Sequence, residues 1–223
     1  IRRKHGMKLL LTSGGITNNT IASALFDLVG KKPEDTSLAF IPTAAHEEHA
    51  DKGWLIDDLA RLKQRGFRSI DIAEIALEDK NIWLPKLEAA DILFFEGGNP
   101  YYLMEQLNKS GLTTLLPKLL EERVYVGLSA GSMVAGRHFA LGASQILYGE
   151  DLDRTEEMPG LGFVDFCILP HLNSPHFEKL REKEIRAVAQ KIPETVYALD
   201  DTSAVRVVDG TVSVVSEGEW FIV

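Results

Sequence analysis

Short, continuously apolar stretches alternate with amphipathic stretches through most of the chain, and this alternation is the strongest constraint on how it can fold. A strand with one face in water would alternate apolar and polar residues, so continuous apolar runs indicate strands buried on both faces. In one amphipathic stretch, Leu55, Leu59 and Leu62 follow helical spacing and Gly66 supplies a C-terminal stop. The predicted strands are 8–12, 37–42, 67–72, 91–95 and 124–128, and the predicted helices are 17–29, 51–65 and 100–122.

This order of strands and helices predicts an open, doubly wound α/β sheet, mostly parallel and flanked by helices, with ligands bound beyond the carboxyl ends of its strands. A further amphipathic helix is expected over 178–191. The C-terminal region is expected to be an antiparallel hairpin region, with Asp209-Gly210 as a two-residue turn and strands at 195–199, 204–208, 211–215 and 220–223. With 45% hydrophobic residues, residues 7–223 are expected to form a single domain around one core.

Net charge limits the range of partners. The formal charge of −9 argues against nucleic acid and anionic membrane surfaces, which attract clustered Lys and Arg. The one concentrated basic run precedes Met7 and a predicted strand, so residues 1–6 are interpreted as a leader in front of the natural start. No apolar run is long enough to cross a bilayer, and a cytoplasmic protein is expected. The single cysteine, Cys167, lies in an apolar run and is interpreted as a buried structural thiol.

The pattern Gly127-x-Ser129-x-Gly131 contains the first signal of chemistry. It follows a predicted strand and precedes a run of small residues, which is typical of a nucleophile elbow. A serine hydroxyl becomes a useful nucleophile only when a base takes its proton and hydrogen-bond donors hold the oxyanion that forms. Ser129 therefore predicts a nearby histidine, an acid and a set of main-chain amides.

Candidate amides follow the predicted strand that ends at Phe95. The stretch Gly97-Gly98-Asn99 lets main-chain N–H groups approach a ligand without a Cβ in the way. The amide of Gly98, paired with that of Ala130, could complete an oxyanion hole. The alternative interpretation is that the glycine pair only forms a tight turn between strand and helix.

His171 is the favoured base because it directly follows a predicted strand, which would hold it rigidly. His176, at the start of the next predicted helix, is the alternative. His138 is too close in sequence to Ser129 to reach it. The two remaining histidines beyond the leader, His46 and His49, are expected in a solvated loop.

The acid is expected in the pair Asp200-Asp201, which follows a predicted strand and could orient the histidine. A turn or helix-capping role is the alternative for this pair. The polar loop 148–157 offers three other acids: Glu150, Asp151 and Asp153.

No metal or cofactor is predicted. The chain has no HxH, HExxH or CxxC spacing, and the glycine pair of 12–17 lacks the remaining residues of a phosphate-binding loop or a dinucleotide fingerprint.

The order of these motifs resembles the dipeptidase E and cyanophycinase family of serine peptidases, from Met7 to the end of the chain. The matching motifs are Gly97-Gly98-Asn99, Gly127 to Gly131, Pro170-His171 and an acid after a later strand. The resemblance implies a class I glutamine amidotransferase-like fold, with serine in place of cysteine at the elbow. It also implies Ser129 as nucleophile, His171 as general base and Gly98 and Ala130 as oxyanion donors. The orienting acid is Glu in the best-known members, and Asp201 falls on that position.

Substrate specificity matches the family less closely. Its aspartyl dipeptidases cleave dipeptides with N-terminal Asp and carry a Glu-Thr-Arg-x-x-Arg motif in the helix after the histidine. Here the corresponding residues are 179–184, and Arg181 alone matches, at the first arginine. Arg181 could pair with a substrate carboxylate, or form a surface ion pair with Glu178 or Glu184. Strict Asp specificity is therefore not expected.

The sequence thus predicts a serine peptidase acting on short peptides, with no cofactor, nucleic acid or membrane partner. Two other hypotheses remain open: a hydrolase of the same fold acting on an ester or a non-peptide amide, and a ligand-binding protein that retains the elbow without catalysis. The sequence does not predict an oligomeric state.

Overall fold

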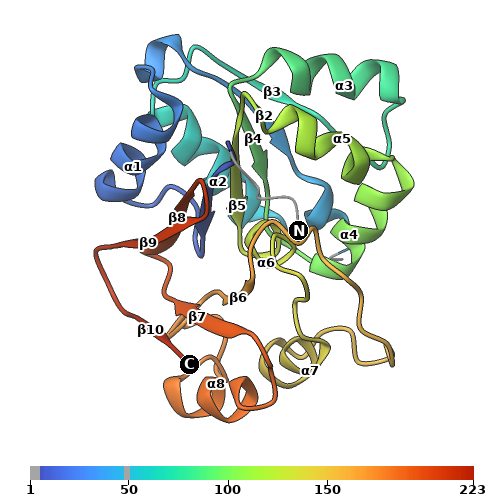
Figure 1. The fold of residues 1–223 in the computed structure, drawn as a ribbon, viewed down its shortest axis with the longest axis vertical. Helices are drawn as coiled ribbons and strands as arrows, with labels where there is room; N and C mark the ends of the chain where they lie inside the picture. Colours follow the sequence, from blue (N-terminus) through green and yellow to red (C-terminus); the bar gives the residue numbers. More distant parts are fainter. Residues whose placement is uncertain (1–5, 48–50) are drawn as a thin grey trace.

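A mostly parallel sheet of seven strands organises the computed structural model, which describes residues 6–47 and 51–223. Its strands are β1 Lys8–Thr12, β2 Ser37–Ile41, β3 Ser69–Ile72, β4 Ile92–Phe95, β5 Val124–Leu128, β8 Ser203–Val208 and β9 Thr211–Ser216. The order is β3-β2-β4-β5-β1-β8-β9; the first five are mutually parallel, and β8 and β9 join antiparallel (Figure 1). The open, mostly parallel sheet predicted from the apolar runs is confirmed.

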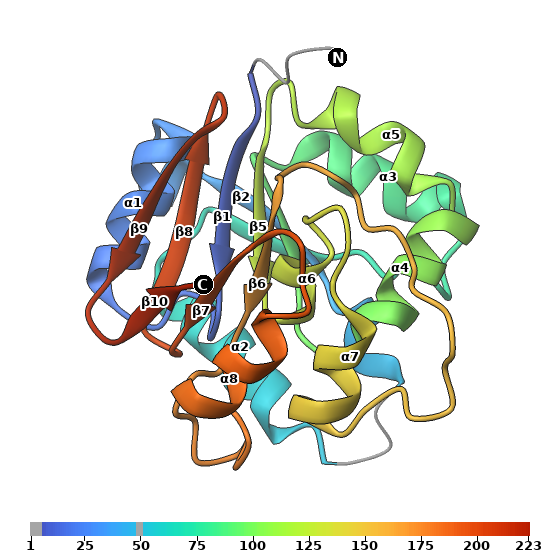
Figure 2. The ribbon, with the colours of Figure 1, turned by 60° about the horizontal axis from the view of Figure 1, so that its bottom comes forward.

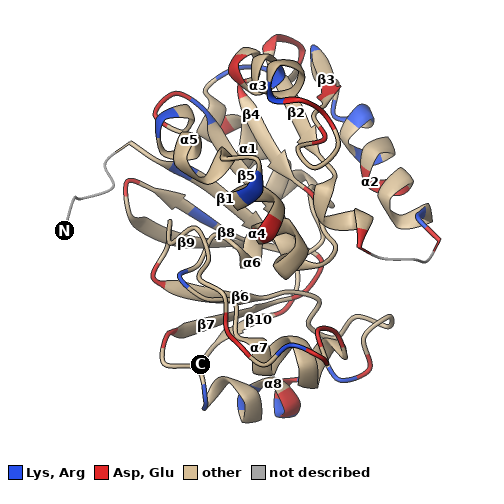
Figure 3. Ribbon diagram, turned by 90° about the vertical axis from the view of Figure 1, so that its right-hand side faces the viewer, with Lys and Arg blue, Asp and Glu red and all other residues tan. Residues whose placement is uncertain are grey.

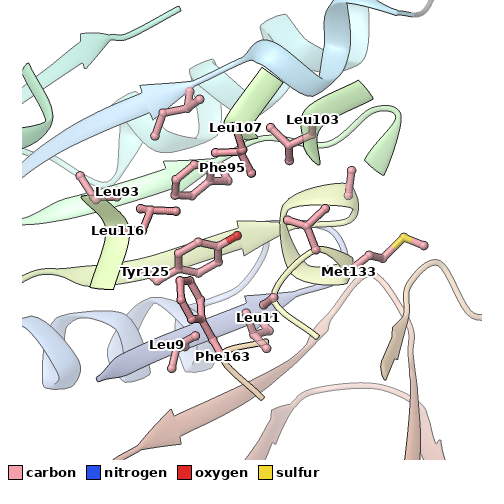
Figure 4. Packing of buried hydrophobic residues seen from close by; sticks show 14 of the residues in the cluster. Leu9, Leu11, Leu93, Phe95, Leu103, Leu107, Leu116, Tyr125, Met133 and Phe163 are labelled. Carbon is pink, nitrogen blue, oxygen red and sulfur yellow. The ribbon is translucent and has the colours of Figure 1, made fainter. Parts of the chain in front are cut away.

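Helices cover both faces of this sheet (Figures 1 and 2). They are α1 Asn19–Val29, α2 Gly53–Gln64, α3 Lys80–Ala89, α4 Pro100–Lys109, α5 Leu112–Leu119 and the short α6 Ala130–Met133. α1 and α2 pack on the face that carries Leu10, Phe40 and Phe94. The other four helices pack on the face that carries Phe95 and Tyr125 (Figure 4). Both faces are therefore buried, which explains why the strands are apolar throughout.

A second, small sheet lies beyond the ends of β1 and β5 (Figure 1). It contains β6 Phe166–Leu169, β7 Thr195–Leu199 and β10 Trp220–Ile222, in the order β10-β7-β6. One face of it packs against α8 Glu182–Ala189 and against α7 Leu141–Ala143, which continues into a π-helical turn over Ser144–Tyr148. Two short 3₁₀ turns, η1 Pro33–Asp35 and η2 Thr43–His46, complete the described elements.

Two predicted helices differ from those in the structure. The expected helix 100–122 is two helices, because Gly111 adopts a left-handed φ of 77° between α4 and α5. The expected helix 178–191 starts only at Glu182, because the Leu180 carbonyl accepts hydrogen bonds from Asn173 N–H and from Arg181.

The predicted β8–β9 hairpin is present, with left-handed φ values at both Asp209 and Gly210. Apart from Gly6, the expected leader lies outside the described residues. Within the described part of the chain, no helix combines the length and apolar character needed to span a bilayer.

Candidate active site

Ser129 lies in the sharp turn between β5 and α6. Its φ of 47° and ψ of −107° are strained for a residue with a side chain. The neighbouring glycines allow this turn, because a Cβ on Gly127 would lie 2.5 Å from the main chain of Gly131. Tyr125 lies in the core on this side of the turn (Figure 4), and its hydroxyl donates a 2.5 Å hydrogen bond to the Gly131 carbonyl. The chain therefore turns at Ser129 as the glycine–serine pattern predicts.

Ser129, His171 and Asp201 come from three distant segments and form a chain of hydrogen bonds. His171 Nε2 lies 2.9 Å from Ser129 Oγ, and His171 Nδ1 lies 2.6 Å from Asp201 Oδ1. His171 follows β6 with a left-handed φ of 69°, and its ring stacks on Phe177 with 4.9 Å between ring centroids. The structure thus brings together the three side chains that were expected to converge.

The charge on Asp201 determines which nitrogen of His171 carries a proton. Burial opposes ionisation of Asp201, but its hydrogen bond with His171, the His171 charge and a hydrogen bond from Ser13 together lower its pKa below the ordinary value. Asp201 is therefore an ionised acceptor near neutral pH. Nδ1 of neutral His171 must then donate to Asp201, which leaves Nε2 free to accept the Ser129 proton.

Ser13 supports this pair and was not predicted from the sequence. Its Oγ accepts a 2.7 Å hydrogen bond from the His171 main-chain N–H and donates a 3.0 Å hydrogen bond to Asp201 Oδ1. Ser13 directly follows β1, the strand beside β5, so its position at the carboxyl edge of the sheet was the available signal.

The glycine turn after β4 lies against Ser129. A Cβ on Gly97 would lie 3.4 Å from that of Ser129, and Gly98 has a φ of 130° that only glycine adopts readily. No described residue accepts a hydrogen bond from the N–H of Gly98 or Ala130. Asn99 has a structural role: its side chain caps α4 through the Tyr102 N–H.

Two of the alternative acids, Asp200 and Asp151, are engaged elsewhere. Asp200 Oδ1 accepts hydrogen bonds from Thr202 and Ser203, and its Oδ2 accepts one from the Glu219 N–H. Asp151 accepts from Ser144, Asn99 and Arg154. Among the acids considered, Asp201 is the one that contacts His171.

A cavity of about 790 Å³ opens in front of Ser129. Its walls include Gly98, His171 and Tyr148, together with one side of α2. Helix α2 carries both acidic and basic residues (Figure 3). The residues of 51–64 that line the cavity are Asp51, Trp54, Asp57, Asp58 and Arg61.

The charged groups of this cavity are mostly acidic. Arg61 is the only Lys or Arg among its described lining residues, and its guanidinium already donates to the Asp58 carboxylate. Asp51, Asp57 and Glu150 add further carboxylates. No group of three or more His, Cys, Asp or Glu side chains in the described residues is arranged to hold a metal ion.

Arg181, for which a substrate carboxylate and a surface ion pair were both considered, is not among the described residues that line this cavity. Its Nη1 donates to the carbonyls of Ser174, Phe177 and Leu180, and so holds the turn before α8.

Among the other histidines, His176 lines the cavity but is not the ring that contacts Ser129. His46 pairs with Glu74, and His138 pairs with Glu194. His49 lies outside the described residues.

An α/β sheet with a serine at a strand end, hydrogen-bonded to a histidine that contacts an ionised aspartate, is the arrangement of a hydrolase. The sequence model of peptidase family S51 matches residues 9–215. The chain therefore belongs to peptidase family S51 and is a peptidase, and the resemblance to dipeptidase E is confirmed.

Relatives in sequence agree with this assignment, and a solved structure shares the fold. The chain is 27% identical over 222 residues to a peptidase E of Streptomyces coelicolor, with 90% of this chain and 81% of the relative covered. It is 26% identical over 166 residues to an uncharacterized peptidase of Pasteurella multocida, with 72% and 76% covered. A Listeria monocytogenes structure proposed to be a peptidase E shares the fold, with a TM-score of 0.77, 20% identity, and 95% and 99% of the two chains covered.

Proposed function

We propose that this protein is a serine peptidase that hydrolyses short peptides with Ser129 as nucleophile. The observation that carries the proposal is the hydrogen-bonded chain from Ser129 through His171 to Asp201, which opens onto the cavity. A cavity of about 790 Å³ has the size of a small-ligand site and suits a short peptide better than a folded polypeptide.

In the proposed reaction, Ser129 Oγ attacks the scissile carbonyl carbon while His171 Nε2 takes the hydroxyl proton. The carbonyl oxygen becomes an oxyanion, which the N–H groups of Gly98 and Ala130 stabilise. Collapse of this intermediate breaks the C–N bond, and His171 gives its proton to the leaving amine. A water molecule then attacks the acyl-enzyme with His171 again as base, which releases the acid and restores Ser129. Asp201 holds the His171 ring and stabilises its cationic form.

Replacement of Ser129 tests this assignment. Ser129→Ala is expected to lower kcat for dipeptide hydrolysis by about six orders of magnitude, because the nucleophile and its base act as a unit. It should also abolish labelling by a fluorophosphonate probe. Ser132→Ala is the matched control, because Ser132 lies on the same short helix and its hydroxyl donates a 2.7 Å hydrogen bond to the Thr12 carbonyl. This variant should leave labelling intact. Equal peptide hydrolysis by the parent and Ser129→Ala would contradict the proposal.

The same probe separates the two alternatives. Labelling of Ser129 without hydrolysis of any dipeptide would favour an esterase or an amidase acting on non-peptide amides. A folded protein that is not labelled would favour a ligand-binding protein without catalysis.

A further inference from the structure

Glu96 is a fully buried carboxyl group directly in front of the Gly97–Gly98 turn, and the proposed reaction does not use it. Its side chain is 0% exposed, and no described N–H or O–H group donates a hydrogen bond of normal geometry to either carboxyl oxygen. Its main-chain N–H donates to the Ile41 carbonyl at 3.0 Å, which fixes the residue at the end of β4. A buried carboxyl group that receives no hydrogen bond is costly, so its presence beside the candidate active site calls for a physical reason.

The charged groups that act on Glu96 are Asp58 and Arg61, and both come from α2. Asp58 is 6% exposed and lines the cavity, and its carboxylate accepts a hydrogen bond from Arg61. Burial, and then the Asp58 charge, raise the pKa of Glu96 well above its ordinary value. Burial also raises the pKa of Asp58, against the effect of Arg61. Two such carboxyl groups do not ionise together readily in a buried setting, and burial favours the neutral form most strongly at Glu96, which is fully buried.

The charge state of Glu96 matters because the next two residues of the chain lie close to the reacting atoms. Gly97 lies against Ser129, and the Gly98 amide is a proposed donor to the oxyanion. A carboxylate at position 96 would place a second negative charge close to that oxyanion, in surroundings that screen it poorly. A neutral carboxylic acid avoids this repulsion and can still donate a hydrogen bond to Asp58.

We propose that Glu96 is a positioning residue that acts as a neutral carboxylic acid. It shares one proton with Asp58, and in this way it holds the Gly97–Gly98 turn beside Ser129 without placing a negative charge close to the oxyanion. This inference rests on the proposed function, because the repulsion that a neutral Glu96 avoids is repulsion of the oxyanion formed in that reaction. Besides Asp58, the charged groups that act on the pair are Arg61 and Asp57 from α2. The other acidic and histidine residues that line the cavity are Asp51, Glu150, His171, His176 and Asp201.

Two substitutions separate a proton-sharing role from simple packing. Glu96→Gln keeps the shape, the neutral state and an N–H donor for Asp58, so its rate of fluorophosphonate labelling and its kcat should stay within about threefold of the parent. Glu96→Met keeps the approximate length but has no proton to share, and its kcat should fall by about tenfold or more with little change in KM. Glu194→Gln is the matched control, since Glu194 pairs with His138 and is not among the described residues that line the cavity; it should behave like the parent.

The charge itself is measured by the ¹³C carboxyl signal of Glu96, assigned by its loss in Glu96→Gln and followed from pH 5 to 10. We expect the neutral form at pH 7. At any pH where the signal moves to the ionised position, the parent should lose labelling rate and Glu96→Gln should not.

An ionised Glu96 at pH 7, a tenfold loss in Glu96→Gln, full activity in Glu96→Met, or ionisation without a loss of rate would each overturn the inference. A parent protein that never labels would overturn the proposed function together with the inference built on it. A neutral carboxyl signal in such a protein would then locate the failure in the chemistry of Ser129 rather than in the charge of Glu96.

Discussion

Ser13 allows a quantitative test, because it contacts His171 and Asp201 but makes none of the described hydrogen bonds to the nucleophile Ser129. Ser13→Ala removes the 2.7 Å hydrogen bond from the His171 N–H and the 3.0 Å hydrogen bond to Asp201. The bond to ionised Asp201 is worth about 1.5–3 kcal/mol and the neutral one about 0.5–1.5 kcal/mol. Only the share of this hydrogen-bond free energy that increases as His171 becomes cationic in the transition state affects kcat. If this share is about 1.4–2.8 kcal/mol, kcat should fall about tenfold to a hundredfold.

The assay compares kcat and KM for the best dipeptide substrate, with the free energy of unfolding measured in urea. Ser203→Ala is the matched control: its Oγ lies 2.6 Å from Oδ1 of Asp200, the neighbouring acid that does not contact His171. Both variants should lose stability, by about 1–3 kcal/mol, and only Ser13→Ala should lose most of its kcat. An unchanged kcat in Ser13→Ala, or an equal loss in both variants, would refute the reasoning that Ser13 acts through His171 and Asp201.

The geometry of the site gives three further predictions. Because carboxylates outnumber the single, already paired Arg61 in the cavity, dipeptides with N-terminal Arg or Lys should show a higher kcat/KM than those with N-terminal Asp, and Asp57→Asn should reduce this preference by about threefold to fivefold at low salt. Gly98→Ala should destabilise the protein by more than about 2 kcal/mol in urea unfolding, because its Cβ would lie 2.2 Å from the Ala44 carbonyl oxygen at a φ of 130°. Since the folded pKa of Asp201 is lowered, its stabilising contribution is complete above its ordinary value of 3.8 and disappears as the pH falls through the lower folded value. The stability difference between the parent and Asp201→Asn, measured by urea unfolding, should therefore shrink below pH 4.

Most of the central sheet could be predicted because burial on both faces leaves a clear sequence pattern. The helix α3 was not predicted, since it includes Pro85 and lacks a clear apolar stripe. The break at Gly111 was missed because apolar residues continue at similar spacing on both sides of it. The small sheet could not be foreseen either, because β6, β7 and β10 pair across long separations in sequence that local pattern does not encode.

The contact between Ser129, His171 and Asp201 could be predicted because each follows a strand, where α/β proteins commonly carry functional side chains. The strands belong to two sheets: Ser129 follows β5 of the central sheet, and His171 and Asp201 follow β6 and β7 of the small one. Ser13 was missed for a different reason. Its glycine-rich surroundings were considered only as a phosphate-binding turn, and a serine that supports two other side chains has no motif of its own. Glu96 was missed because its burial depends on tertiary packing, which a single charged residue after a strand does not reveal.

The candidate site also depends on strain that the core must hold. Ser129 and His171 both adopt left-handed φ values, an arrangement that costs of order 1–3 kcal/mol for each residue. The Ser129 turn is held by Tyr125, which is buried in the core and bonds the Gly131 carbonyl. His171 is held by the Ser13 hydroxyl at its main-chain N–H and by Phe177 against its ring. Because separate contacts hold each residue, loss of one should loosen one partner and lengthen the contact between Ser129 and His171, while the fold persists.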